Sequence, residues 1–361
     1  MYAQRSGAGT LPSVNATGPT TIPAFLHFDV EPDGFQVPRD GRDAWSGYGA
    51  FHEFSRSLRD ALARASGATA TFNWYFRTDP QIAQMFGRAD VAVTGFPDRV
   101  AALCAAGDGF GVHVHPLRWS ADRGVWVHDI GDRRWLRDCT SSALDAFERS
   151  IGAPARLFRS GAGFLHDEIV DVLDERGVVL ELGLEPVSGV GRPDTVASGV
   201  DASPIVGEYV ECSAAPRTPY RPDPQDFRRR GGANARRITI VPATTAPRRL
   251  PPSGWGLRLR RLLGRPPRSH STRVLFPSGD WPSDRSFWDL AAHQLSVMER
   301  PYLSIGVRTD ARDSAVAATV KRRLWALARH PLARRLRFVN PLDAVDQITP
   351  PLVAPPRLVA S

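Results

Sequence analysis

The sequence predicts an α/β fold in which parallel strands alternate with helices. Short segments rich in apolar, β-branched and aromatic residues, such as 25–29 and 302–308, alternate with stretches of helical periodicity, such as 51–65. We find neither an internal repeat nor a linker between residues 25 and 345, which indicates one domain. Alternation of this kind is typical of an open parallel sheet or of a (β/α) barrel.

In the first half of the chain, each element has a local signal. Phe51, Phe54, Leu58 and Leu62 recur at helical spacing, and the helix at 97–106 has a proline near its start and a glycine after its end. The expected order is strand 25–29, helix 51–65, strand 68–76, helix 97–106, strand 111–115, helix 140–151, strand 156–159, helix 166–176 and strand 178–184.

The second half is less regular. Asn340 is a suitable cap for a last short helix that begins with Pro341. The expected order is strands 205–211 and 237–241, helix 284–299, strand 302–308, helix 314–329, strand 337–339 and the capped helix.

Composition indicates a soluble globular protein. The 361 residues are 42% hydrophobic and 23% charged, and no apolar run approaches the roughly 20 residues that span a bilayer. Residues 1–24 have no apolar core of a secretory signal and are expected to form a flexible arm, whereas 349–361 form an extended tail. Three widely spaced cysteines argue against a disulfide framework. We therefore expect a cytoplasmic protein with its barrel at 25–348.

The formal net charge of +8 comes almost entirely from arginine. Many of these arginines lie between Arg228 and Arg273, in a Pro-rich insertion at about 214–272. Such a window suits contact with an anionic surface, but a solvated insertion is the simpler explanation. Nothing in it has the signature of a nucleic-acid module, and no nucleic-acid partner is expected.

The most informative segment is 111–116, in which His113 and His115 alternate with valines. In a strand, side chains at i and i+2 share a face and lie about 7 Å apart. Two imidazoles on one face can supply half of a metal site, although paired histidines also occur as ordinary hydrogen-bonding groups.

The other half is expected in the first strand, which ends in three carboxylates at alternate positions, Asp29, Glu31 and Asp33. One of them can complete the coordination of a metal ion and another can act as a base, unless Pro32 to Gly34 form only a turn. In parallel α/β folds, sites collect at the carboxyl ends of strands. The residues at or just past such ends are Asp29, Glu31, His113, His115, Arg159 and Glu185.

Order and spacing give a resemblance to the polysaccharide deacetylases, carbohydrate esterase family four of the NodB-homology type. The family's first strand ends Thr-Phe-Asp-Asp-Gly, and residues 27–34 read His-Phe-Asp-Val-Glu-Pro-Asp-Gly. Its next motifs are similar to Ala70-Thr71-Phe72-Asn73, to the histidine strand followed by Pro116, and to residues 159–163. The resemblance covers about 24–185 and implies a distorted (β/α) barrel with a divalent metal, zinc or alternatively cobalt or nickel.

The resemblance also implies roles for single residues. Asp29 takes the place of the family's base and Arg159 that of the arginine that pairs with it, while His113 and His115 replace the metal histidines at a shorter spacing. Val30 stands where the family has a metal-binding aspartate. We expect Glu31 to assume that role, because i+2 returns it to the face of Asp29.

One departure affects the chemistry. The family's last motif ends a strand with the histidine that protonates the leaving amine, and residues 302–310 contain no histidine. His27 shares the face of Asp29 and is the expected substitute, with His128, His166 and Asp310 as alternatives. The residues expected to bind substrate are Trp74, Trp119 and Arg308. Arg308 would bind a carboxylate or phosphate group of the substrate.

The sequence thus predicts a metal-dependent N-deacetylase that acts on an acetylated sugar or a surface-polysaccharide precursor. The alternative is a catalytically impaired barrel that binds a glycan or a protein partner. A glycosidase needs two carboxylates that flank the glycosidic bond it cleaves, and the pair that the sequence provides is Asp29 with Glu185.

Overall fold

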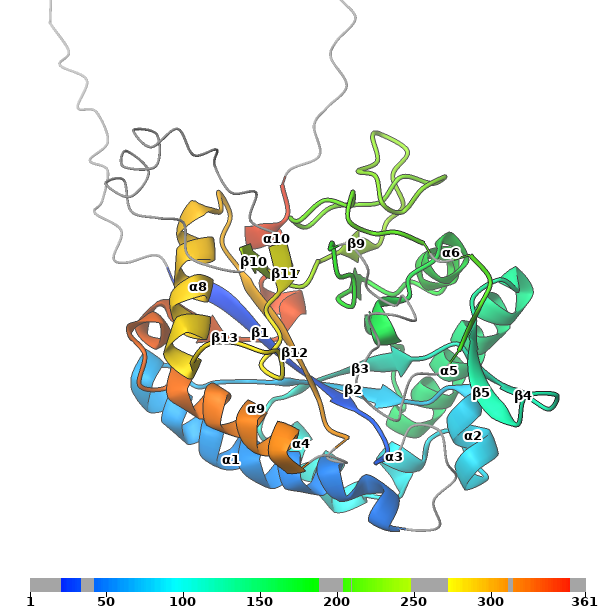
Figure 1. Cartoon of the computed structure of the whole chain (residues 1–361), viewed down its shortest axis with the longest axis horizontal. Helices are drawn as coiled ribbons and strands as arrows, with labels where there is room; N and C mark the ends of the chain where they lie inside the picture. The colour runs from blue at the N-terminus through cyan, green and yellow to red at the C-terminus, as the bar shows by residue number, and fades with distance from the viewer. Residues whose placement is uncertain are drawn as a thin grey trace, which may run out of the picture.

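The computed structural model is built around one curled parallel sheet (Figure 1). It describes residues 21–33, 42–187, 204–208, 210–247, 272–310 and 314–350. The strand order is β12-β1-β2-β3-β6-β7-β9, and β13 pairs with the start of β1. The strands are β1 (Ile22–Val30), β2 (Asn73–Arg77), β3 (Gly109–Val114), β6 (Leu157–Ser160), β7 (Leu180–Glu181), β9 (Thr239–Ile240), β12 (Leu303–Arg308) and β13 (Leu336–Phe338).

The two edges of this sheet are joined irregularly. After β9, the Thr244 amide donates to the Ser304 carbonyl at 3.0 Å, and the Ser304 amide donates to Thr244 Oγ1 at 2.8 Å. The Tyr302 hydroxyl donates to the Pro242 carbonyl at 2.9 Å. These few bonds bring β9 and β12 together without a regular ladder, and the predicted distorted (β/α) barrel is confirmed.

Residue alternation in β1 explains how the barrel is filled. Leu26, Phe28 and Val30 point to the outer core beneath the helices, whereas Phe25 packs in a separate inner cluster. That inner cluster also contains Ala344 and Ile348, which cover the end of the barrel opposite the site. All nine residues of β1 are buried, as expected for a strand covered on both faces.

Helices cover the outside of the sheet. On one side lie α1 (Ser46–Ser66), α8 (Asp284–Val297) and α9 (Ser314–Leu327), and on the other α5 (Arg133–Ile151) and α6 (Asp167–Glu175) (Figure 1). The remaining helices are η1 (Arg42–Trp45), α2 (Pro80–Phe86), α3 (Val91–Thr94), α4 (Pro97–Ala105), η2 (Gly161–Gly163), η3 (Pro331–Arg335), η4 (Pro341–Asp343) and α10 (Val345–Ile348).

The predicted elements are found with shifted ends. The helix predicted at 140–151 begins at Arg133, because the Asp132 side chain accepts from the Trp135 amide at 3.0 Å and caps it. Asn340 caps the predicted last turn by accepting from the Leu342 amide at 3.0 Å. The strand predicted at 205–211 is found only at its start, as β8 (Ile205–Val206). Helices α2 and α3 were not predicted, nor were β4 (Leu117–Ser120) and β5 (Val125–Asp129), which form a small sheet with β8, or the pair β10 (Thr245–Pro247) and β11 (Thr272–Val274).

The domain boundaries need one adjustment. Strand β1 begins at Ile22, so the arm predicted at 1–24 is three residues too long, because Ile22 and Ala24 pair with β13. Residues 1–20 and 351–361 lie outside the described residues, as does the part of the predicted insertion at 248–271. Among the described residues, no helix has the length and apolarity that a bilayer crossing requires.

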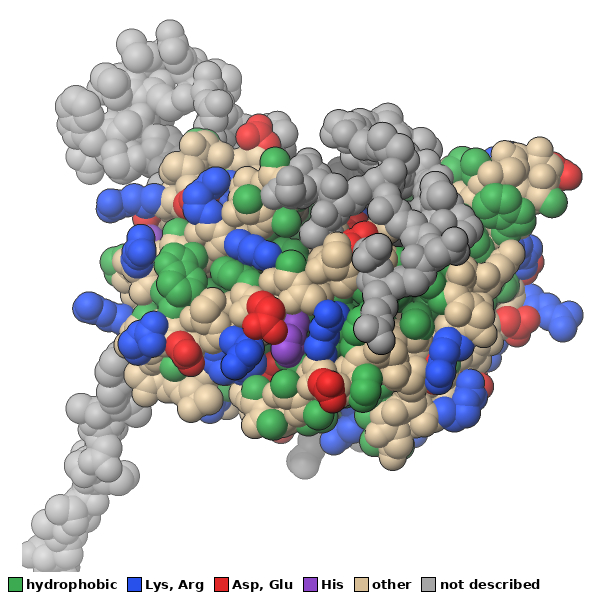
Figure 2. All heavy atoms as spheres, turned by 90° about the horizontal axis from the view of Figure 1, so that it is seen from below, with side chains coloured by type: hydrophobic (Ala, Val, Ile, Leu, Met, Phe, Trp, Pro, Cys, Tyr) green, Lys and Arg blue, Asp and Glu red, His purple; other side chains and the backbone are tan. Residues whose placement is uncertain are grey.

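Part of the arginine window has a structural role. Arg236 is buried and bonds to Asp171 at 2.8 Å and Asp167 at 3.0 Å, which fastens the 210–247 segment to α6. Arg228 pairs with Asp226 at 2.8 Å. On the face shown in Figure 2, basic and acidic side chains are interspersed. Contact of Arg228–Arg273 with an anionic surface therefore stays a prediction.

Candidate metal centre

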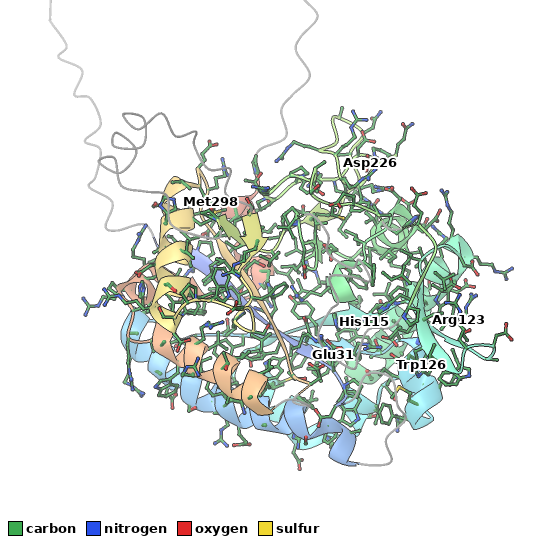
Figure 3. All side chains as sticks on the ribbon, in the orientation of Figure 1. Glu31, His115, Arg123, Trp126, Asp226 and Met298 are labelled. Carbon is green, nitrogen blue, oxygen red and sulfur yellow. The ribbon has the colours of Figure 1, made fainter. Side chains whose placement is uncertain are left out.

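Three buried side chains meet at the carboxyl ends of β1 and β3. Glu31, His113 and His115 each offer a ligand atom, and these atoms lie within 4.8 Å of one another. The two Nε2 atoms are 3.1 Å apart, and each is 3.5 Å from a Glu31 carboxylate oxygen. Two imidazoles and one carboxylate are a ligand set typical of catalytic zinc sites that keep a further position open. Figure 3 shows Glu31 and His115 close together and far from Asp226 and Met298.

Strand register explains this meeting. Strand β2 lies between β1 and β3, with Val30 opposite Phe76 and Arg77 opposite His113. Glu31 continues the inward face of β1 one residue past its end, and His115 follows β3 in the same way. The alternation inferred from the sequence therefore directs all three side chains into the mouth of the barrel.

The two imidazoles are oriented by neighbouring groups. His113 Nδ1 lies 3.0 Å from the Arg159 carbonyl, so that the ring presents Nε2 to the site. The His115 backbone amide donates to Asp79 at 3.3 Å. A Cβ on Gly161 would lie 2.2 Å from the His115 ring, so only glycine leaves room for this imidazole.

A buried ion pair adjoins the three ligand candidates. Arg159 donates from Nε to Asp29 Oδ1 at 2.7 Å and from Nη2 to Oδ2 at 3.1 Å. The same guanidinium donates to the Leu182 carbonyl. Such a bidentate pair fixes the orientation of the carboxylate. The pairing of Asp29 with Arg159 that the resemblance implied is present.

Two further arginines flank Glu31. Arg77 Nη1 lies 3.6 Å from one carboxylate oxygen and Arg308 Nε lies 3.3 Å from the other. Burial opposes ionisation of Glu31, but Arg308 and the two histidines outweigh it and hold the pKa of Glu31 well below its usual value. Burial, followed by the charge of Arg77, lowers the pKa of His115. The site thus favours an ionised carboxylate and a neutral imidazole, the forms that bind metals.

The residues fit a metal ion by a second criterion. Among the described residues, the buried Glu31 Oε2 accepts no hydrogen bond, and its ion-pair contacts with His115 Nε2 at 3.5 Å and Arg77 Nη1 at 3.6 Å are long. A buried carboxylate oxygen left in this way is costly unless another ligand occupies it. The chemistry of the donor set and this orphaned atom both suit a divalent cation.

His27 lies one layer below the mouth. It is fully buried, its Nε2 is 3.1 Å from Ser304 Oγ, and its ring packs edge-on against Tyr75. Burial, with the charge of Arg159, lowers the pKa of His27 well below its usual value. A neutral, enclosed imidazole is poorly suited to donate a proton, so this position disfavours the catalytic role predicted for His27.

The alternative donors are also engaged elsewhere. His128 Nε2 faces His115 Nδ1 at 3.5 Å, behind the ligand set. The His166 side chain caps α6 by accepting from the Glu168 amide at 3.2 Å. Asp310 accepts from Arg308 at 2.5 Å. None of these three presents a proton to the space in front of Asp29.

Of the predicted substrate-binding residues, two remain accessible. Trp119 on β4 is 39% exposed, and the Arg308 side chain is 54% exposed at the end of β12, where its backbone pairs with Asp29. The prediction for Trp74 is wrong. This indole is fully buried on the outer face of β2, stacks on Phe28 at 4.4 Å and donates to Asp108 at 2.9 Å.

This difference can be measured by denaturation. We expect Trp74→Ala to lower the free energy of unfolding by about 3–5 kcal/mol, because it leaves a cavity in the outer core. Trp119→Ala is expected to cost less than about 1 kcal/mol. Urea unfolding monitored by circular dichroism compares the two variants, and equal losses would contradict the packing described for Trp74.

Sequence reasoning missed the support of the site. Arg77 is fully buried, bonds to Asp79 and donates to Gln81 at 2.6 Å, while Asp79 in turn holds the His115 amide. The sequence signal that could have revealed this network is a charged residue, Arg77, at the end of a strand of aromatic residues. This network positions one ligand candidate and places a cation beside another.

A scan against models of protein families found no match, and neither did a search of curated proteins. Solved structures give low-level similarities. A deacetylase described as putative, from Mycobacterium smegmatis, is 12% identical at a TM-score of 0.47, with 96% of this chain and 99% of that chain covered. Puue allantoinase is 13% identical at a TM-score of 0.46, with 94% and 93% covered.

A family 4 carbohydrate esterase pseudoenzyme from Bacillus anthracis is 14% identical at a TM-score of 0.29, with 52% of this chain and 55% of that chain covered. At these identities and TM-scores, none of these structures carries an argument about this chain, and the function has to be argued from the site itself.

Proposed function

We propose that this chain is a divalent-metal-dependent hydrolase that removes the acetyl group from an N-acetylated sugar or surface-polysaccharide precursor. The observation that carries the proposal is the convergence of Glu31, His113 and His115 beside the Asp29–Arg159 pair. Zinc is the metal that best suits two imidazoles and a carboxylate, with cobalt or nickel as alternatives.

Glu31, His113 and His115 are the residues that would hold the ion. When bound, a divalent ion lowers the pKa of coordinated water and polarises a carbonyl group. In this proposal Asp29 accepts the proton of the attacking water, and Arg159, which donates to both of its carboxylate oxygens, orients it. Trp119 and Arg308 at the rim are the proposed contacts with the sugar and with an acidic substituent.

Acetate release tests this function directly. Protein loaded with zinc, cobalt or nickel is incubated with N-acetylglucosamine oligomers and with other N-acetylated hexosamines. We expect acetate release that stops on chelation and returns when the metal is restored. Protein that takes up about one equivalent of metal but releases no acetate from any amide would favour the alternative, a barrel that binds glycan or a partner without turnover.

That alternative rests on one specific observation. Strand β12 ends in Arg308 and not in a histidine, so the resemblance leaves the leaving amine without a proton donor. Unless another group provides the proton, amide hydrolysis would be slow.

A further inference from the structure

Amide hydrolysis in this site requires a group that donates a proton to the leaving nitrogen. None of the residues assigned a role so far is such a donor. When the C–N bond breaks, the nitrogen leaves readily only if it is protonated. The geometry disfavours His27, His128, His166 and Asp310, each of which is enclosed or engaged elsewhere. A donor has to lie at the rim, near Asp29 but outside the ligand set.

Glu185 has this position. It follows β7 at the rim of the barrel, three residues after Leu182, whose carbonyl accepts from Arg159. Just before it, the Leu184 carbonyl accepts from the Ala243 amide at 2.9 Å, which holds this segment against the chain after β9. Besides burial, the charges of Arg159, Asp29 and Glu181 act on its carboxyl group.

The opposite wall of the mouth is close. A Cβ on Gly306 of β12 would lie 2.6 Å from Arg159 Nη2, so β12 can approach Arg159 only because glycine has no side chain.

Among the described residues, the Glu185 carboxyl group has no hydrogen-bond or ion-pair partner. A half-buried carboxyl group without a partner is a group that the fold itself does not use.

We propose that Glu185 donates the proton to the leaving amine nitrogen, an inference that rests on the proposed deacetylase function. Water adds its oxygen to the acetyl carbon and gives one proton to Asp29. The C–N bond then breaks, its electron pair stays on nitrogen, and the nitrogen takes the carboxyl proton of Glu185. Acetic acid, which keeps the second proton of the water and ionises in solution, is released with the free amine, while Asp29 loses its proton to solvent and Glu185 regains one.

The environment of Glu185 supports this role. Burial raises the pKa of Glu185 to about 7, against the weaker opposing effect of Arg159. A carboxyl group with this pKa keeps its proton below pH 7 and loses it above. About half of the molecules therefore carry the proton at neutral pH, which suits a general acid.

Two substrates separate proton donation from the other steps. The variant Glu185→Gln is assayed with an N-acetylglucosamine oligomer, whose amine needs a proton, and with 4-nitrophenyl acetate, whose phenolate leaves without one. We expect amide hydrolysis to fall about 100-fold to 1000-fold, and ester hydrolysis to change less than about threefold. Glu185→Asp keeps a carboxyl group and is expected to restore part of the amide activity.

The pH profile gives an independent readout. For the wild-type chain, kcat/KM for the amide should fall as pH rises above about 7, because the donor of the free protein is then deprotonated. The same limb should be absent in Glu185→Gln. Glu175→Gln, at an exposed glutamate on the last turn of α6, is the matched control, and thermal melting with metal content shows whether each variant is folded and loaded.

The possible failures are distinguishable. If Glu185→Gln lowers amide and ester hydrolysis equally, or neither, Glu185 is not the donor. If His27→Gln is the variant that loses amide hydrolysis selectively, the donor is His27 and the inference is wrong. If the loaded wild-type chain cleaves only the ester, the deacetylase function itself is wrong, and the role of Glu185 falls with it.

Discussion

Asp29→Asn should reduce acetate release by about 1000-fold or more without loss of bound metal. The substitution keeps the size of the side chain and one oxygen that can accept from Arg159, but removes the group placed to take the proton of water. Glu31, His113 and His115 are untouched, so metal content should equal that of the wild-type chain. The measurement is kcat at saturating substrate with metal content by atomic absorption.

Stability is the competing explanation. Removing one partner of a buried ion pair costs about 3–5 kcal/mol, and here it would leave the Arg159 guanidinium without its counter-charge. Asp108 offers a matched control, because it is a buried aspartate that bonds to Arg59 through two contacts of 2.8 Å on the outer face.

Asp108→Asn should therefore lower stability by a similar amount and leave kcat close to that of the wild-type chain. If both variants lose activity in proportion to the folded fraction, the loss at Asp29 is structural. Retention of a tenth or more of kcat in folded Asp29→Asn would contradict the assignment of the base.

The alternation of side chains between the two faces of a strand made the central residues of the site predictable. His113 and His115 alternate with valines, and Asp29 and Glu31 alternate with apolar residues, so each pair had to share a face. The position of the strands in one parallel sheet then placed both pairs at the same end. For this reason Glu31 was a better ligand candidate than the adjacent Val30, which packs in the outer core.

The same reasoning failed on β2, because this strand carries large side chains on both faces. Residues 73–77 read Asn-Trp-Tyr-Phe-Arg, and a fully buried strand of this kind has no polar alternation to reveal which face is inward. The register with β1 shows that Tyr75 faces inward with Asp29, whereas Trp74 faces Phe28 and the helices.

Long-range charge pairs were also hidden. Arg236 belongs to a run of arginines that suggested solvated charge, yet its carboxylate partners Asp167 and Asp171 lie more than 60 residues earlier in the chain. Such an arginine can be buried only because of carboxylate partners that the local sequence pattern does not reveal. The buried pair Arg77 and Asp79 is local, but its contact with the His115 amide depends on the fold.

The second large effect concerns metal uptake. We expect the wild-type chain to bind about one equivalent of zinc, and His113→Ala and His115→Ala each to retain less than about a tenth of it. Each variant leaves two ligand candidates of three, and a site with an incomplete ligand set holds zinc poorly. Dialysis against a metal buffer followed by atomic absorption measures the retained zinc.

Thermal unfolding gives a readout that does not depend on activity. A metal that binds only the native state at 100 times its Kd adds about 2.7 kcal/mol to the free energy of unfolding, so zinc should raise the Tm of the wild-type chain and not that of either variant. His52→Ala, at a buried histidine of α1, is the matched control and should keep the zinc-dependent shift. If the His113 and His115 variants also keep it, the ion binds elsewhere. In that case the convergence of these side chains with Glu31 has another cause, since neither imidazole would then be a ligand.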